Sequence, residues 1–207
     1  MGGAAEIALF AQSLLIGLSI AAPVGPVGLL TIQRTLELGR SAGLATGLGA
    51  AFADALYGAV GAFGVAALIE AMTAARLPLA AGGSVFLLWL AYRTWRAPTS
   101  QSAAEAPGAT DLLRCFVGTF MLTLSNPAMI LSFIAVFGAF GARFAVASPW
   151  LMVAGVWLGS ALWWWVLSFA VGRLRERFDM HWRRRVNLGS AALLAGFALW
   201  QMGGLLR

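Results

Sequence analysis

Long apolar stretches alternate with short clusters of charged residues along the whole chain. Six intervals between these clusters hold almost no charge, and each matches one membrane crossing of about 20 helical residues, the third being short. The runs are continuously apolar rather than alternating, which excludes the strands of a membrane barrel and favours helices. The pattern predicts spans at about 7–33, 41–69, 77–92, 113–141, 148–172 and 187–206.

Composition supports the same class. Hydrophobic residues make up 60% of the 207, charged residues 11%, and the mean hydropathy is +0.83. A soluble domain has roughly 45–50% apolar and 25% charged residues. The first run lacks a basic leader and continues to Gln33, so we interpret it as a retained helix rather than a cleaved signal. We therefore expect an all-α integral membrane protein with about six transmembrane helices.

The distribution of arginine predicts the orientation in the membrane. Eleven of the 14 basic residues, all of them arginine, fall in the first, third and fifth predicted loops. The positive-inside rule places these loops in the cytoplasm and both termini in the periplasm of a bacterial inner membrane. The fifth loop carries six arginines between two spans, which favours a topology anchor against anionic lipid over nucleic-acid binding.

The spans divide into two halves of three helices. Residues 1–96 form the first half, 97–111 a small and polar cytoplasmic linker, and 112–207 the second half. Because three is odd, the halves would lie in opposite orientations, as two inverted three-helix repeats of the kind found in many secondary transporters. Each half opens with a helix interrupted by proline, at Pro23 to Pro26 and at Ser125-Asn126-Pro127.

These two breaks predict a substrate site. Proline removes a backbone donor and frees carbonyl groups at a depth where lipid offers no partner. Freed carbonyls can coordinate a cation, and a helix N-terminus can hold a carboxylate. The alternative is a pair of simple kinks. The candidate residues at the breaks are Pro23, Gly25, Pro26, Ser125, Asn126 and Pro127.

Asp54 is the seventh candidate, since it is the one charged residue inside the six intervals between the charge clusters and lies near mid-membrane. A carboxyl group there costs roughly 2.5–3.5 kcal/mol on insertion scales and must face protein or water. It could bind a proton and a substrate amine in turn. The alternative is a neutral tie between two helices.

Other chemistry is poorly supported. Cys115 and His181 are each the sole residue of their type, so neither a disulfide nor a histidine metal cage is expected. An intramembrane enzyme would need a nucleophile with its base, or a second acid, and Asp54 stands alone. We expect no cofactor, no metal and no enzymatic activity.

Three stretches resemble the LysE/RhtB family of bacterial amino-acid exporters. They are residues 21–58, which begin A-A-P-V-G-P-V-G, then Gly82-Gly83 followed by F-L-L-W-L-A-Y-R-T-W-R, and L-S-N-P-A at 124–128. The resemblance implies export driven by an ion gradient, with protons as the expected ion. Many members read P-G-P-N at the first break, where this chain has Val27. Basic-amino-acid exporters read N-P-N-A-Y-L-D after the second break, where this chain has Ser132 in place of the acid.

The resulting hypothesis is a secondary exporter of neutral amino acids or related small metabolites. A heavy-metal exporter of the wider superfamily is the alternative within transport, and a membrane enzyme or scaffold ranks last. The expected partners are a small-molecule substrate, an amino acid by the resemblance, and the lipid bilayer. A homo-oligomer is compatible with the sequence, and nucleic acid is not expected.

Overall fold

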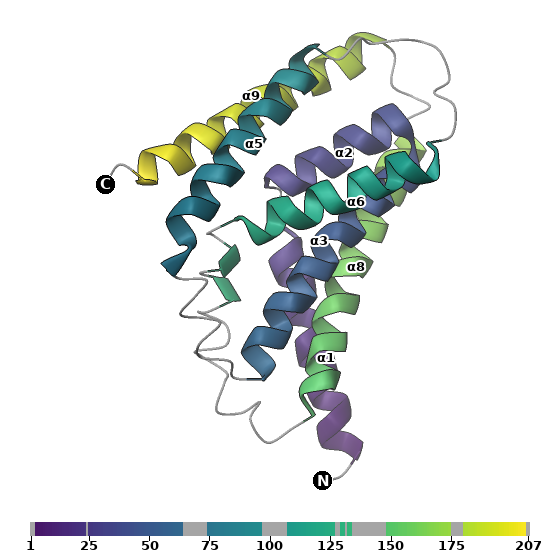
Figure 1. Cartoon of the computed structure of the whole chain (residues 1–207). Coiled ribbons are helices and arrows are strands. Elements are labelled where there is room, and N and C mark those ends of the chain that lie inside the picture. Colours follow the sequence, from purple (N-terminus) through teal and green to yellow (C-terminus); the bar gives the residue numbers. More distant parts are fainter. Residues whose placement is uncertain are drawn as a thin grey trace.

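In the computed structural model, all regular secondary structure of the described residues is helical, and these residues form no strand. Those residues form seven helices (Figure 1), which confirms the all-α class. The described residues are 3–23, 25–63, 74–96, 107–126, 129–130, 132–133, 148–174 and 180–205.

Three of these helices are long and apolar enough by themselves to cross a membrane, namely α1, α3 and α8. The helices are α1 (Gly3–Ala21), α2 (Pro26–Leu38), α3 (Arg40–Ala62), α5 (Arg76–Arg96), α6 (Ala109–Leu124), α8 (Pro149–Leu174) and α9 (Met180–Leu205).

The first predicted span is divided into two helices. α1 ends at Ala21, and α2 begins at Pro26 after Gly25, whose backbone is extended at φ −108° and ψ −164°. Proline suits the first position of a helix because its fixed φ is helical and its missing N–H would lack an intrahelical acceptor there. The break therefore lies where the prolines predict it.

The second break is described only in part, because Pro127 lies outside the described residues. α6 ends at Leu124, and the backbone N–H of Ser125 donates to Met121 O at 2.9 Å. Asn126 O then accepts from the N–H groups of Met129 and Ile130 at 3.1 and 3.3 Å, so helical bonding resumes after Asn126.

Small residues let α1, α3, α6 and α8 pack closely as one bundle. Gly159 of α8 lies against the backbone of Leu14, and Gly17 of α1 lies against the backbone of Val156. A side chain on either glycine would collide with the neighbouring main chain. α1 and α8 run parallel, whereas α3 runs antiparallel to α8, as Gly43 lies near Ser168 and Gly58 near Val156.

The pair formed by α5 and α9 lies to one side of this bundle (Figure 1). The two helices are antiparallel, since Gln201 near the end of α9 donates through Nε2 to Ala80 O, near the start of α5, at 2.8 Å. The short helix α2 contacts α3 and α8 on one side and α9 on the other. It therefore connects the pair to the bundle.

Candidate functional site

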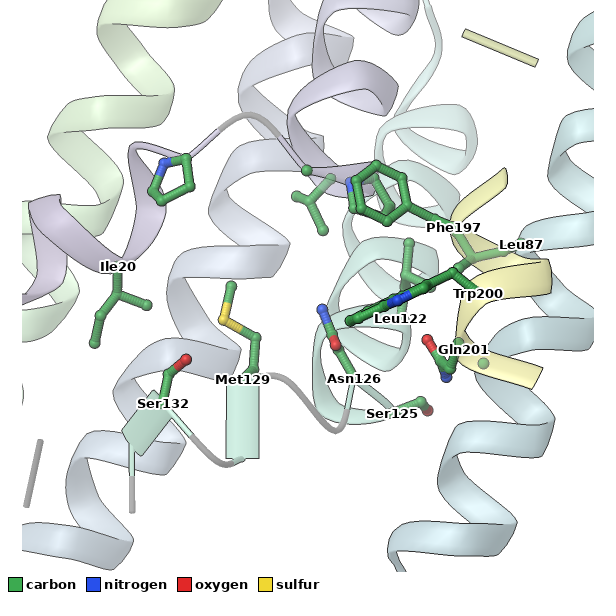
Figure 2. Close-up of a pocket in the computed structure, with 15 residues that line it drawn as sticks. Ile20, Leu87, Leu122, Ser125, Asn126, Met129, Ser132, Phe197, Trp200 and Gln201 are labelled. Carbon is green, nitrogen blue, oxygen red and sulfur yellow. The ribbon is translucent and has the colours of Figure 1, made fainter. Parts of the chain in front are cut away.

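A cavity of about 230 Å³ lies where the two helix breaks meet the α5–α9 pair. Figure 2 shows the side chains of Asn126, Met129 and Trp200 directed into the space between these segments. The lining residues are Ile20, Pro23, Gly25, Pro26, Val27, Gly83, Leu87, Leu122, Ser125, Asn126, Met129, Ser132, Phe197, Trp200 and Gln201.

Five of the seven candidate residues share this cavity. Pro23, Gly25 and Pro26 line it from the first break, and Ser125 and Asn126 line it from the second. These two groups lie about a hundred residues apart in the sequence. The sixth candidate, Pro127, is not among the described residues, and the seventh, Asp54, is described but does not line the cavity.

The first break presents the positive end of a helix to the cavity. The first intrahelical bond of α2 runs from Leu29 N–H to Gly25 O at 3.1 Å, and no side chain caps this end. The N–H groups of Val27 and Gly28 belong to the first turn, where a helix offers no acceptor of its own. Such an end attracts a carboxylate.

The second break presents the opposite polarity. α6 ends beside the cavity, and the C-terminal end of a helix carries the partial negative charge of the helix dipole. Ser125 and Asn126 add polar side chains beside this end. The two helix ends can therefore meet the carboxylate and the ammonium group of one zwitterion.

Asp54 lies away from the cavity, in the contact between α3 and α8. It is fully buried, and its Oδ2 accepts a hydrogen bond from Ser160 Oγ at 2.7 Å. Ser160 Oγ in turn accepts from Trp164 Nε1 at 3.1 Å. Among the described residues nothing bonds Asp54 Oδ1. The geometry places this acid in a helix contact with one oxygen still available.

Tyr57 joins the helix that carries Asp54 to the cavity wall. It lies one turn after Asp54 on α3, and its hydroxyl donates to Leu124 O at 2.8 Å. Leu124 is the last residue of α6 and precedes the lining residues Ser125 and Asn126. A shift of α3 would therefore act directly on the second break.

Sequence reasoning missed the wall that α9 supplies, formed by Phe197, Trp200 and Gln201. These residues reach the cavity through the pairing of α9 with α5, and no local pattern in an apolar helix marks that contact. A metal site is not supported within the described ranges, which contain no group of three His, Cys, Asp or Glu residues able to share an ion.

The cavity between broken helices defines the class, a membrane transporter. The model of the LysE type translocator family matches residues 18–202, so the chain belongs to this family of transporters and is not an enzyme. It is 30% identical to the uncharacterized membrane protein YahN of Escherichia coli, over 82% of this chain and 78% of that protein.

Two further relatives carry more descriptive names. The threonine efflux protein of Salmonella typhi is 26% identical over 84% of this chain and 88% of its own length. The putative amino-acid transporter YggA of Aeromonas salmonicida is 27% identical over 91% of this chain and 96% of its own length. No solved structure matches this chain.

Proposed function

We propose that this chain exports neutral amino acids from the bacterial cytoplasm across the inner membrane, coupled to protons. The observation that carries the proposal is the cavity, where a helix N-terminus and a helix C-terminus face one uncharged space. The helix ends match the two charges shared by all amino acids. The described lining residues include no charged side chain, so a charged substrate side chain would find no partner among them.

Val27 and Ser132 support a neutral substrate. Both line the cavity, at the positions where the sequence departs from the family pattern. Val27 replaces an asparagine amide of many members, and Ser132 replaces the acid of the basic-amino-acid exporters. An apolar and a hydroxyl group at these points suit a small aliphatic or hydroxylated side chain. The threonine efflux relatives agree with this class and with outward transport.

The pattern of helix contacts supports two inverted repeats. If the first half is mapped onto the second, α1 corresponds to α6, α3 to α8, and α5 to α9. This mapping converts the contact of α1 with α8 into that of α6 with α3 and leaves the contacts α3–α8 and α5–α9 unchanged. The parallel contact of α1 with α8 then corresponds to that of α6 with α3, where Gly49 lies near Phe116 and Tyr57 bonds Leu124 O. The exchange also swaps the two members of the pair α3–α8 and of the pair α5–α9. Both pairs are antiparallel, as a two-fold symmetry axis lying in the membrane plane requires.

Asp54 is the proposed proton carrier. Its burial between α3 and α8 and its one unbonded oxygen within the described part suit a group that gains and loses a proton as those helices move. Tyr57 would transmit that movement to the second break.

Efflux from preloaded cells or vesicles tests this function. We expect threonine, alanine or another neutral amino acid to leave faster with the protein than without it, and faster still with a pH gradient, whereas lysine and divalent metals should not. Export of metal, or of no amino acid, would contradict the proposal.

Substitution of Ser132 tests substrate specificity in the same efflux assay. Ser132→Asp places a carboxylate in the cavity, at a cost of roughly 2.5–3.5 kcal/mol unless a cation pairs with it. Neutral efflux should fall about tenfold and lysine efflux should appear. Ser132→Asn is the matched control of equal size without charge, and it should not gain lysine efflux.

A further inference from the structure

A polar cluster, buried in large part, joins the three helices α2, α5 and α9. Thr94 Oγ1 of α5 donates to Gln33 Oε1 of α2 at 3.0 Å, and Asn187 Nδ2 of α9 donates to Glu37 Oε1 of α2 at 2.7 Å. Gln33 Nε2 also donates to Glu37 Oε1 at 3.2 Å. Gln33, Thr94 and Asn187 are all buried. We call these four residues the latch.

The latch lies beyond one end of the cavity on every helix that forms it. On α5, Thr94 follows the lining residue Leu87 by seven positions, which is about 10 Å along the helix. On α9, Asn187 precedes the lining residue Phe197 by ten positions, about 15 Å. On α2, the first turn lines the cavity, and the latch residues lie in the last two turns.

This is the end of α5 and α9 at which most of their arginines lie. Arg93 and Arg96 flank Thr94, and Arg184 and Arg185 precede Asn187. By the proposed orientation it faces the cytoplasm. An exporter must admit its substrate from that side, so this end has to open once in each cycle.

Apolar side chains fill the space between the cavity and the latch. Leu30 of α2, Leu90 of α5 and Leu194 of α9 belong to one buried cluster and are almost inaccessible. The path from the cavity toward the arginine-rich end is therefore closed first by these leucines and then by hydrogen bonds.

A neighbouring face of α2 is fixed to the bundle. Arg34 Nη1 donates to Thr46 Oγ1 of α3 at 3.1 Å, to Cys115 O of α6 at 2.9 Å and to Thr119 Oγ1 of α6 at 3.0 Å. One short helix thus holds the bundle through Arg34 and the α5–α9 pair through Gln33 and Glu37. Separation of the pair from α2 breaks the bonds from Thr94 to Gln33 and from Asn187 to Glu37, and it leaves the arginine contacts intact.

We propose that Gln33, Glu37, Thr94 and Asn187 form the inner gate of the transporter, whose bonds between α2 and the α5–α9 pair break to admit substrate from the cytoplasm. The proposal rests on the proposed function for its direction. The same helix presents its N-terminus to the cavity, about 20 Å from its other end. Arrival of the substrate carboxylate and closure of the gate therefore act on one rigid element.

Cross-linking tests the gate. In a Cys115→Ala background, Gln33→Cys and Thr94→Cys place two thiols where the native side chains meet tip to tip, within reach of a short bifunctional methanethiosulfonate. Neutral amino-acid efflux should fall at least fivefold on cross-linking and return on reduction. A smaller loss, or one that reduction does not restore, overturns the proposal.

A second pair controls for cross-linking as such. Leu9→Cys and Met152→Cys in the same Cys115→Ala background join α1 and α8, whose native side chains pack in one buried cluster away from Asp54 and the latch. The same methanethiosulfonate should leave efflux of this pair within twofold. An equal loss in both pairs overturns the gate. Absence of neutral amino-acid efflux from the wild-type protein would instead contradict the proposed function.

Accessibility tests the gate independently of transport. Asn187→Asp sets a carboxylate against Glu37, so the latch should open. Leu90 lies between the cavity and the latch, so a Leu90→Cys thiol should then react with a membrane-impermeant maleimide added from the cytoplasmic side. We expect this reaction to be at least tenfold faster than with Asn187 intact. The matched Asn187→Gln variant keeps the amide and should not accelerate labelling. Equal labelling rates in the two variants overturn the proposal.

Discussion

At the scale of single residues, Asp54 combines burial with incomplete bonding. Its side chain is inaccessible, and Ser160 bonds one carboxyl oxygen. A plain structural tie would be served equally well by a neutral amide, whereas a proton carrier requires a group that ionises. The geometry allows a substitution that separates the two roles.

Asp54→Asn should insert at normal levels and lose efflux against a gradient, because the amide still accepts from Ser160 but cannot release a proton. Preloaded efflux with and without a pH gradient, normalised to protein in the membrane, measures this. Gradient-driven efflux equal to wild type would remove Asp54 from the mechanism.

Ser160→Ala is the companion variant, since it keeps the carboxyl group and removes its donor. Loss of this buried hydrogen bond should cost about 1–3 kcal/mol of stability and also leave Trp164 Nε1 without its acceptor. Detergent-extracted protein should show a lower thermal midpoint while gradient coupling persists. Coupling lost in Ser160→Ala and kept in Asp54→Asn would contradict this assignment.

The sequence identified Asp54 because one acid in an apolar interval is conspicuous, but it could not supply the partner. Ser160 lies 106 positions away on another helix, and one serine among many small residues carries no signal. The side chains of the run Trp163 to Trp165 point in different directions around the helix. Among the three only Trp164 is nearly inaccessible, whereas Trp165 is half-exposed.

At the scale of elements, α2 is the helix on which most of the proposed chemistry depends. It begins at Pro26 in the cavity wall, and Gly39, at φ 102°, ends it. This left-handed backbone is accessible to glycine and lets α3 begin one residue later. The tight turn at Gly39 keeps α2 short. Its N-terminus therefore lies at the cavity and its C-terminal turns at the latch.

Restoring continuous helix at the first break tests that dependence. Pro26→Ala supplies a backbone N–H and removes the ring that opposes helix formation, so the chain can continue into α2 without a free N-terminus. Losing the terminus as a carboxylate partner, worth up to about 2 kcal/mol, should lower efflux about tenfold.

Pro149→Ala is the matched control, since Pro149 also opens a helix but does not line the cavity. It should insert equally well and keep its efflux. Equal efflux from both variants would favour a simple kink at Pro26.

The sequence predicted the first break from its prolines, since the effect of proline on a helix is local. It did not predict how far helical structure continues after the break. Arg34 was interpreted as a loop residue because charge normally ends a span, yet α2 continues to Leu38. Arg34 is accommodated there because Thr46, Thr119 and the Cys115 carbonyl accept its hydrogen bonds, and these partners come from two other helices.

At the scale of the whole molecule, the contacts divide the structure into a bundle of α1, α3, α6 and α8 and a pair of α5 and α9, joined by α2. Apolar runs predicted the helical class because backbone satisfaction in lipid leaves few alternatives. They could not predict which helices pair, since every apolar face suits both lipid and protein. That pairing is what brings α9 to the cavity and supports the inverted repeats.

The orientation of this assembly in the membrane follows from arginine placement alone and can be tested directly. Arg93, Arg96 and Arg114 flank the linker, and the loop before α9 also holds arginines. Reporter fusions after residues 104 and 180 should therefore fluoresce as green fluorescent protein and be inactive as alkaline phosphatase. A fusion at Arg207 should behave in the opposite way, because α9 ends on the other side after a sixth crossing. The same orientation makes the latch an inner gate, since it lies at the arginine-rich ends of α5 and α9. A cytoplasmic reporter at Arg207 would contradict the six-span arrangement and the inverted repeats.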